Sequence, residues 1–541
     1  MHGLMQDRQL TIPWIFHRVE QLYGHKVVVT ATPRGDVATT YREWAARVRK
    51  LAAVLDALGI SDGGRVGTYA ANSQSHLEVY IAAPCTNRVV HTINIRLSTD
   101  DVRYIIEHAD DEVVFIDRAR LADLWPTVAT LPGVKHWIVL DDGTDAEVPD
   151  HPRVLDYEQL LAAASTMTGR FVVDDERRAA GLCYTSGTTG RPKGVAYSHR
   201  SIVLHTLMTL GADYVGVRER DQVMPIVPMF HVNAWGLPHA ALMAGAGLIL
   251  PGASLAPENL LSMIERHRAT VTGGVPTVWE SMVPHFDDFD LSSLRIIVGG
   301  GSATPPSLFD SIRRGTGIPI THAWGMTETS PIAVVGGLRS DHDDLEPAAQ
   351  REVEAQQGQP VPLVELRLVD TAGIEQPWDG ESSGEIQVAG PWAASAYFND
   401  GSNDNAFTVD GWLRTGDLAT INETGYVRIV DRLKDVIKSG GEWISSVALE
   451  NAIVAHPDVA EAAVIAKPDP RWMERPVACV VVDRDSDLSA DDILDHLRPL
   501  VAKWWLPDEI RFVDQLPRTG TGKIAKALLR DELQPSPTDA T

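Results

Sequence analysis

The sequence has few cysteines, no long apolar run and no excess of positive charge, and each shortage excludes a class of protein. Its three cysteines, Cys85, Cys183 and Cys479, are far apart and lack metal-ligand spacing, which fits a reduced, cytoplasmic compartment. No apolar run reaches about 18 residues, so we expect no membrane span. The first residues lack a cationic stretch followed by an apolar core, so no signal peptide is expected. The net charge of −25 argues against nucleic acid as a partner, because a nucleic-acid binder needs a basic face.

The length of the chain and its apolar pattern predict several α/β domains. At 541 residues the chain is too long for one ordinary core. Up to about residue 175, Arg65–Tyr69 and Glu112–Asp117 read as strands, whereas Thr40–Trp44 opens a helix that ends near Leu58 and Gly59. Alternation of strands and helices predicts an α/β fold in which helices cover parallel sheets. The apolar residues of this region are assigned to the core.

A polar stretch, Tyr184–Gly194, lies between two strand-like runs, Ala179–Tyr184 and Val195–Ser198. It contains three glycines, four hydroxyl residues and a lysine. Free N–H groups in such a loop form an anion-binding nest, and a lysine there suits phosphate. A mere surface turn would need only one or two such residues. A strand rather than a helix follows, so this is not a Walker A loop. We assign phosphate contacts to Thr185, Ser186, Gly187, Thr188, Thr189 and Lys193.

Two later segments and one acidic residue are further candidates for a binding site. The segment 227–236 holds His231 and Trp235, a composition that also suits a buried core cluster. The segment 296–305 is a strand that runs into a glycine turn, and α/β proteins bind ligands at such strand ends. Glu328 lies among hydroxyl residues, and its carboxylate suits Mg²⁺, which takes few protein carboxylates together with phosphates. The alternative for Glu328 is a helix-capping turn.

The last part of the chain adds three candidates. Asp417 follows a tight turn, where an aspartate can accept hydrogen bonds from both ribose hydroxyls. Asp431–Ser446 is dense in charge and then in glycine, a pattern that a solvated turn would also show. Ser446 is the expected N-cap of the helix that follows. Lys523 lies in a glycine-rich loop just before a helix, where a surface lysine would need no explanation.

Together these motifs resemble those of the acyl-adenylate-forming superfamily, which contains acyl-CoA synthetases, luciferases and the adenylation domains of peptide synthetases. The resemblance spans nearly the whole chain. The run His231–Trp235 is similar to that of the long-chain fatty acyl-CoA synthetases, and the related methylmercaptopropionate-CoA ligases are also similar. The resemblance implies an α/β protein. Its large N-terminal domain, residues 1–430, has two sheet-and-helix subdomains and a barrel-like piece, and its small mobile C-terminal domain, residues 431–541, begins at a hinge, Asp431.

The resemblance implies two half-reactions. A carboxylate attacks the α-phosphate of ATP and gives acyl-AMP and pyrophosphate, and the CoA thiolate then attacks the acyl-AMP carbonyl. ATP, Mg²⁺ and coenzyme A are therefore expected, with a carboxylic acid, foremost a fatty acid, as substrate. The chain is expected to be an AMP-forming acid–thiol ligase, and a homodimer is allowed.

The motifs and the resemblance together assign roles to individual residues. Catalytic roles are expected for Lys523, Glu328, Thr185 and His231, and Mg²⁺ ligands are expected at Thr185 and Glu328. Besides the phosphate loop, nucleotide contacts are assigned to Gly300, Gly301, Ser302, Ala323, Trp324, Gly325, Met326, Thr327, Asp417 and Arg432. The acyl group is assigned to His231, Trp235, Gly300, Gly301 and Ser302, with the tryptophan as gate of the acyl tunnel. The CoA side is assigned to Asp435, Lys438, Gly440, Gly441, Glu442 and Trp443.

Two departures from the relatives bear on packing and on the substrate. Thr86-Asn87-Arg88 stands where a small pair with glycine is common, so Arg88 brings a charge that alters local packing or a subunit contact. Gly273-Gly274 stands where Ala-Gly is frequent, which widens or reshapes the acyl pocket. One rival interpretation is a natural-product adenylating enzyme that takes an aromatic acid or nitrite, or uses another acceptor. Others are a luciferase-like oxidation and a non-catalytic binding module, and the intact phosphate loop weighs against the last.

Overall fold

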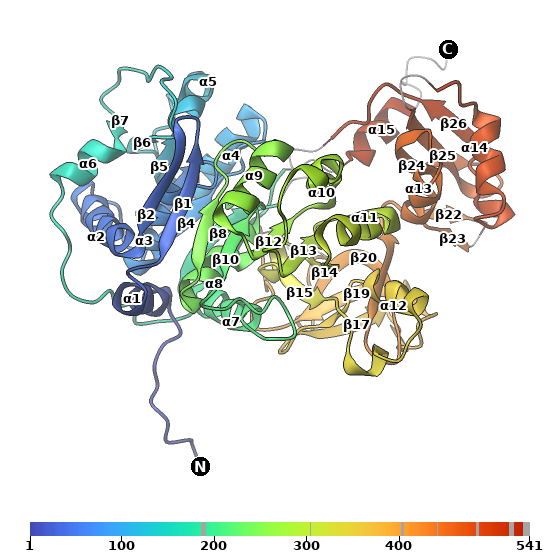
Figure 1. Cartoon of the computed structure of the whole chain (residues 1–541), viewed down its shortest axis with the longest axis horizontal. Coiled ribbons are helices and arrows are strands. Elements are labelled where there is room, and N and C mark those ends of the chain that lie inside the picture. Colours follow the sequence, from blue (N-terminus) through green and yellow to red (C-terminus); the bar gives the residue numbers. More distant parts are fainter. Residues whose placement is uncertain are drawn as a thin grey trace. The chain divides into compact units, whose positions relative to one another are not determined.

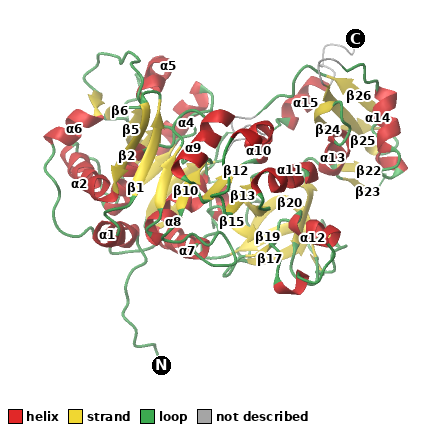
Figure 2. Cartoon of the chain, in the orientation of Figure 1, coloured by secondary structure: helices red, strands yellow, loops and turns green. Residues whose placement is uncertain are grey.

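The structure is a computed structural model that describes residues 1–185, 191–302, 304–401, 405–440, 442–482, 486–518 and 524–533. Contacts within the chain divide it into two compact units. The first contains Met1–Thr185, Pro192–Glu365 and Ala389–Leu413, and the second consists mainly of residues 366–388 and 414–533. Figure 1 labels the elements along the chain, and Figure 2 shows helices bordering the strands of both large sheets.

One large sheet of the first unit has seven strands in the spatial order β7-β6-β5-β3-β4-β8-β9. The strands are β3 (Arg65–Tyr69), β4 (Val89–Thr92), β5 (Asp111–Asp117), β6 (His136–Leu140), β7 (Val154–Asp156), β8 (Ala179–Tyr184) and β9 (Gly194–Ser198). All neighbours are parallel except β8 and β9, which are antiparallel. The strands expected from the sequence at β3, β5, β8 and β9 are therefore confirmed, with bounds that differ by one residue at most.

The other large sheet of this unit has nine strands in the order β16-β15-β14-β13-β12-β10-β11-β1-β2. The strands are β1 (Val27–Thr32), β2 (Gly35–Thr40), β10 (Gln222–Pro225), β11 (Gly247–Leu250), β12 (Val271–Gly274), β13 (Ile296–Gly300), β14 (Ile320–Gly325), β15 (Ile332–Val335) and β16 (Gln359–Pro360). Its central strands, from β1 to β14 in the spatial order, are parallel, and the edge strands are antiparallel. The first unit thus contains the two sheet-and-helix layers that the motif pattern predicts.

Twelve described α-helices lie in the first unit. They are α1 (Ile12–Leu22), α2 (Tyr41–Ala57), α3 (Gln74–Cys85), α4 (Thr99–Ala109), α5 (Arg118–Val128), α6 (Tyr157–Ala163), α7 (His199–Thr209), α8 (Leu237–Ala244), α9 (Pro257–His267), α10 (Pro276–Met282), α11 (Pro306–Thr316) and α12 (Pro347–Glu354). Helix α2 begins as expected, because Thr40 Oγ1 accepts from Glu43 N at 3.2 Å and the Glu43 carboxylate accepts from Thr40 N at 2.9 Å.

The second unit contains two smaller sheets. The first has the order β18-β17-β19-β20-β21 and takes the place of the expected barrel-like piece. Its strands are β17 (Glu365–Val369), β18 (Glu375–Gln376), β19 (Ser383–Ala389), β20 (Leu413–Ile421) and β21 (Val427–Arg432). The other has the order β23-β22-β25-β24, with β26 beside β25. Its strands and helices are β22 (Ile437–Ser439), β23 (Glu442–Ile444), α13 (Ser446–Val454), β24 (Val459–Asp469), β25 (Met473–Val482), α14 (Ala490–Leu497), β26 (Glu509–Phe512) and α15 (Lys526–Leu533).

Three expectations about packing can be compared with the structure. None of the helices in the described ranges is long and apolar enough to cross a membrane. All three cysteines are buried and unpaired. Arg88 is 5% exposed, and its guanidinium lies 2.7 Å from the Asp56 carboxylate and donates to Ile60 O at 2.8 Å. The charge of Arg88 therefore belongs to packing within this chain rather than to a subunit contact.

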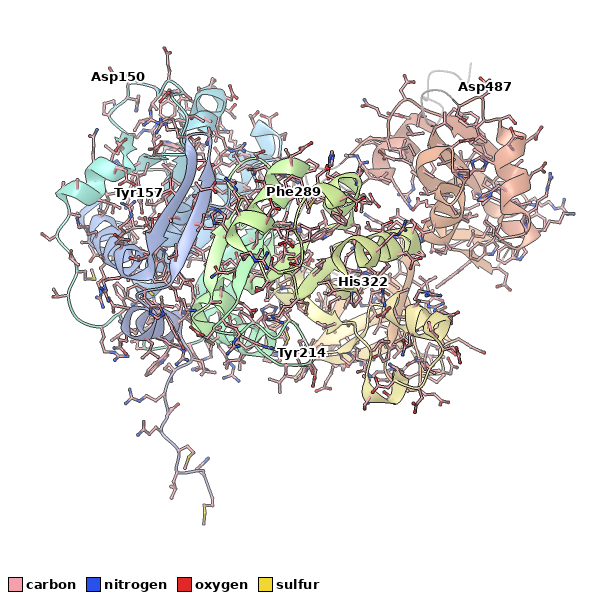
Figure 3. The ribbon with its side chains drawn as sticks, viewed as in Figure 1. Asp150, Tyr157, Tyr214, Phe289, His322 and Asp487 are labelled. Carbon is pink, nitrogen blue, oxygen red and sulfur yellow. The ribbon has the colours of Figure 1, made fainter. Side chains whose placement is uncertain are left out.

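A buried carboxylate joins three helices of the first unit. The side chain of Glu78 on α3 has no solvent exposure, and it accepts from Arg47 Nε of α2 and from Tyr157 OH of α6, each at 2.6 Å. Figure 3 labels Tyr157 on its helix. Burial raises the pKa of Glu78, and Arg47 opposes that shift. An uncompensated charge at this position would be costly, so Arg47 holds the helices together through Glu78.

Replacement of Arg47 should therefore destabilise the fold. We expect Arg47→Ala to lower the unfolding free energy by about 3 kcal/mol, because breaking a buried pair leaves the other charge without its partner. The measurement is denaturant unfolding followed by fluorescence. The matched control is Arg177→Ala, since the Arg177 side chain is 84% exposed and forms a surface ion pair with nearby Asp175. Equal unfolding midpoints for the two variants would show that Glu78 does not depend on its cation.

Candidate active site

The base of the phosphate loop is closed by the antiparallel strands β8 and β9. Thr185 N donates to Lys193 O at 2.9 Å, and Lys193 N donates to Thr185 Oγ1 at 3.0 Å. These two bonds fix both ends of the loop at the carboxyl end of β8. The remaining loop residues assigned to phosphate, Ser186, Gly187, Thr188 and Thr189, lie outside the described residues, as do Gly441 and Lys523.

Lys193 and Glu328 are brought together by a residue that the motifs do not identify, Tyr397. The Tyr397 hydroxyl donates to Glu328 Oε1 at 2.6 Å, and Lys193 Nζ lies 4.7 Å from the centre of the Tyr397 ring. Lys193 Nζ is also 3.3 Å from an Asp400 carboxylate oxygen. Burial raises the pKa of Tyr397, and the Glu328 charge raises it further, so the phenol stays protonated and donates. Thr185, Lys193 and Glu328 therefore belong to one connected group.

The turn that carries Glu328 is fixed by its backbone. Glu328 is 5% exposed. The Tyr197 hydroxyl on β9 donates to Thr327 O at 2.7 Å, and Ala394 N donates to Glu328 O at 2.7 Å. A buried carboxylate on a turn held in this way is a suitable oxygen ligand for a hard cation that also binds phosphate.

The glycine turn after β13 is in the expected position at the edge of the nine-stranded sheet. Gly300 pairs with Ala323 of β14, and a Cβ at Gly300 would lie 2.4 Å from Ala323 O. Gly301 has φ +86°, a left-handed conformation that favours glycine. The carboxyl ends of β12, β13 and β14 meet at this edge, where α/β sheets bind ligands. The expected nucleotide segment from Ala323 to Thr327 consists of the last three residues of β14 and the two residues that follow it.

Trp235 lies against this glycine turn. Cβ atoms at Gly273, Gly300 and Gly301 would lie 3.4, 3.6 and 3.8 Å from atoms of its indole ring. The ring is 6% exposed, so it forms a buried wall at the ends of β12 and β13. His231 stands at the start of the same segment and is partly buried. The structure therefore places Trp235, Gly300 and Gly301 together, as the acyl-site assignment expects, and a Cβ at position 273 would lie closest to Leu237 Cδ1, at 3.2 Å.

The backbone that presents Trp235 is left-handed. Val232, Asn233, Ala234 and Trp235 have φ between +46° and +56°, and Gly236 follows at +73°. A left-handed conformation costs about 1–2 kcal/mol for each non-glycine residue. Buried polar groups hold the turn, because Tyr80 OH donates to Asn233 O at 3.3 Å and Cys183 Sγ donates to Asn233 Oδ1 at 3.2 Å. Strain of this kind is retained where surrounding structure fixes it and where function requires it.

The candidates of the second unit form a separate group on β20 and β21. Asp417 and Arg432 are cross-strand partners, and Arg432 Nε lies 2.6 Å from Asp417 Oδ1. Asp417 is only 4% exposed, whereas the Arg432 side chain is 44% exposed. The pair therefore offers a buried carboxylate with a partly exposed cation beside it, which suits a sugar with hydroxyl groups.

Asp431 is tied to the helix that follows it. Its Oδ2 accepts from Ser446 N at 2.6 Å and from Ser446 Oγ at 2.7 Å. Lys526 Nζ of α15 donates to Ser446 Oγ at 2.8 Å and lies 2.6 Å from Glu450 Oε1. The expectation that Ser446 caps α13 is wrong, because Ser445 Oγ accepts from Ala448 N at 3.1 Å and Ser446 instead binds Asp431.

The residues assigned to CoA surround a short hairpin. Lys438 on β22 pairs with Trp443 on β23. Gly440 has φ +64° at the turn, and its N–H donates to Trp472 O at 2.8 Å. Lys438 and Glu442 are exposed, and Asp435 is buried beside Arg530. The hairpin is thus exposed to solvent at Lys438 and Glu442 and anchored at Gly440.

The fold and these sites define a class of protein. A phosphate-type loop at the carboxyl end of a parallel sheet, a buried metal-type carboxylate and a glycine turn with an apolar wall together indicate an α/β enzyme that uses a nucleotide to act on an organic acid.

Comparison with known proteins names the family. The model of the AMP-binding enzyme family matches residues 16–398, and that of the AMP-binding enzyme C-terminal domain matches residues 448–523. The chain belongs to the AMP-binding enzyme family. It is 43% identical to a long-chain-fatty-acid–CoA ligase of Thermus thermophilus, over 98% of this chain and 96% of that one. It is 41% identical to a 3-methylmercaptopropionyl-CoA ligase of Ruegeria lacuscaerulensis, over 99% of each chain.

A solved structure agrees with this assignment. The crystal structure of an anthranilate CoA ligase in complex with anthranoyl-AMP superposes with a TM-score of 0.86, at 27% identity, over 98% of this chain and 99% of that one. The protein is therefore an AMP-forming acid–CoA ligase: it activates an acid as acyl-AMP and transfers it to CoA. The sequence resemblance to adenylate-forming enzymes is confirmed.

Tyr397 should control adenylation through Glu328. Tyr397→Phe removes the hydroxyl donor but keeps the ring beneath Lys193. Hydrogen bonds to charged groups contribute about 1.5–3 kcal/mol, so we expect acid-dependent pyrophosphate release to slow about tenfold to a hundredfold. The control is Tyr214→Phe, which removes a hydroxyl from a partly exposed tyrosine on the segment after α7 and should leave the rate unchanged. An unaltered rate in Tyr397→Phe would mean that Glu328 acts without this donor.

Proposed function

We propose that the protein converts a fatty acid into its CoA thioester. The observation that carries this proposal is the buried indole of Trp235 against the glycine turn, which gives an apolar wall beside the expected site of the carboxylate. The Thermus thermophilus relative is named for long-chain fatty acids, whereas the other two are named for a thioether acid and an aromatic acid. Gly273 leaves room beside Trp235, which favours an extended acyl chain over a compact one.

The ATP side of the proposal rests on the group around Tyr397. The phosphate loop and Lys193 would hold the pyrophosphate that leaves, since phosphoryl and nucleotidyl transfer demand mainly positioning and charge neutralisation. Glu328 and Thr185 fit Mg²⁺, because this ion needs only one or two protein ligands when phosphates supply others. When bound, Mg²⁺ would neutralise charge on the phosphates. In the described part of the chain no group of three metal-binding side chains occurs, which agrees with such a shared site.

The second unit would supply the ribose contacts and the hinge. The Asp417 carboxylate would accept hydrogen bonds from the ribose hydroxyls, and Arg432 would lie beside it. The backbone of Asp431 pairs with Leu418 in the β20–β21 ladder, while its carboxylate binds Ser446 of α13. One residue thus connects the small sheet with the C-terminal layer. This double attachment supports a division of the chain into residues 1–430 and 431–541 with Asp431 as the hinge.

Two half-reactions would use opposite faces of the C-terminal domain. Lys523 would neutralise the charge that grows at the α-phosphate during adenylation. The hairpin around Gly440, Gly441, Glu442 and Trp443, with Asp435 and Lys438, would line the path of the CoA thiol. Alternation between two poses keeps water from the acyl adenylate until the thiol arrives. A cytoplasmic location is part of the proposal, which the three buried, unpaired cysteines support.

The substrate assignment predicts the outcome of an acid panel. With ATP and Mg²⁺, medium- and long-chain fatty acids should give AMP release that depends on CoA, and Trp235→Ala should shift the preferred chain length without raising the KM for ATP. The measurement is AMP formation with and without CoA across aliphatic, aromatic and amino acids. Turnover of aromatic acids alone would instead favour an enzyme of specialised metabolism. Equal loss for all acids together with a raised KM for ATP would make Trp235 a structural residue.

The two-pose mechanism predicts separate defects. Lys523→Ala should stop acyl-AMP formation but still convert supplied acyl-AMP into thioester, because thiol attack needs no cation at the phosphate. Gly441→Leu should form acyl-AMP and accumulate it, since a side chain there would enter the thiol path. Each half-reaction is measured alone, with purified acyl-AMP for the second. Parallel loss of both steps in both variants would mean that a single pose serves the whole reaction.

A further inference from the structure

A cavity of about 600 Å³ lies in the first unit, and its lining contains neither Thr185 nor Trp235. One wall is formed by the carboxyl ends of β3, β5 and β6, with Tyr69, Asp117 and Asp141. The opposite wall is formed by the ends of β1 and β11, with Thr30 and Pro251. A volume of this size suits a small organic ligand. Neither the family assignment nor the proposed reaction uses this cavity.

The cavity coincides with a change of direction in the seven-stranded sheet. From β3 the chain passes through α3 to β4 on one side, and from β4 it passes through α4 to β5 on the other side of β3. The loops that follow β3 and β5 therefore separate, and they leave a crevice between the ends of these strands. Open α/β sheets bind ligands at such a topological switch point. Ala71 and Asp117, which follow or end the two strands, both line the cavity.

A buried carboxylate reaches this crevice. Asp117 is 3% exposed, and its Oδ2 accepts from Ala71 N at 2.8 Å. Arg120 Nε is 3.8 Å away, too far for a hydrogen bond. Among the described residues, Asp117 makes no hydrogen bond besides that of Ala71, and it does not cap α5. Burial raises the pKa of Asp117 to about 7. The carboxylate is thus desolvated, and the Arg120 cation pairs with it without a hydrogen bond.

The lining is acidic and partly apolar. Four aspartates, Asp117, Asp123, Asp141 and Asp142, face a single arginine. Asp142 already accepts from Ala119 N and Thr144 N, and Asp141 pairs with Arg34. Asp117 and the exposed Asp123 are left for a ligand. An anion would be repelled by this lining. The described ranges contain no group of three side chains that could hold a metal ion, so these aspartates do not form one.

We propose that this cavity binds a small aliphatic amine, whose ammonium group pairs with Asp117 while its carbon chain lies against Tyr69, Leu124 and Pro251. The ammonium supplies hydrogen-bond donors beside that of Ala71 N and a cation closer to the carboxylate than Arg120. The apolar wall takes the methylene groups. The site is independent of the proposed fatty-acid reaction, and the identity of the acid does not enter the argument.

The test is calorimetric titration of the full chain with 1,4-diaminobutane, beside 1,4-butanediol as a neutral probe of matched length. The amine should bind with saturation at one site per chain, and the diol should not bind. Asp117→Asn keeps the acceptor for Ala71 N but removes the charge, and it should weaken amine binding by about tenfold or more. Because the chain carries a net charge of −25, general attraction of cations must be separated from the site. Asp213→Asn, which removes an exposed carboxylate outside the cavity, should bind as the unaltered chain does.

A second variant tests the cavity without changing charge. Ala253 is exposed at the mouth of the cavity, so Ala253→Trp should fill the space, leave the melting temperature unchanged and abolish amine binding. The Ala253→Trp variant therefore tests the proposed amine site even if Asp117→Asn folds poorly. The proposal is overturned if the unaltered chain shows no saturable binding of the amine, if the diol binds equally well, or if Ala253→Trp binds as the unaltered chain does.

Discussion

Parallel strand pairing is the constraint on which the first unit depends. Because parallel neighbours point the same way, the chain must leave every strand at one edge of the sheet, and polar residues collect there. Thr185 follows β8, the glycine turn follows β13, and Asp117 ends β5. The antiparallel pair β8–β9 is the exception in the seven-stranded sheet. Because β9 runs back beside β8, both ends of the expected phosphate loop are fixed to the sheet. If a helix followed β8 instead, the sheet would fix only the first end of the loop.

The left-handed turn before α8 shows how the fold maintains an unfavourable backbone conformation. The free-energy cost of this conformation is local, but the contacts that hold the turn come from elsewhere. They come from β8 of the seven-stranded sheet and from α3, a helix that packs against that sheet. The side chain of the turn, Trp235, lies against the nine-stranded sheet. The turn thus contacts elements that belong to both large sheets. A right-handed turn would relieve the strain but would point the indole away from the glycines that it contacts.

The elements that the sequence predicts well are those specified by neighbouring residues. The helix that begins after Thr40 and the apolar run of β8 depend on contacts within a few residues, and both are found as expected. The N-cap of α13 is displaced by one residue because a distant group, Asp431, takes the serine that the local pattern would assign to the cap. Tyr397 could not be found by such patterns, since it lies 69 positions from Glu328 and has no periodic relation to it. The site residues beyond the described ranges remain expectations.

Electrostatics distinguishes the proposed nucleotide site from the rest of this acidic chain. Lys193 is already held by Asp400 and by the face of Tyr397. In the proposed site, a polyphosphate would exchange with the Asp400 carboxylate, so Lys193 would change its partner. A carboxylate at 3.3 Å is a modest partner, and a ligand with several charges would compete with it better than a ligand with one. On the proposed function, Asp400 would therefore favour polyphosphate over single-charge anions at Lys193, and Tyr397 would keep Glu328 in position as a metal ligand.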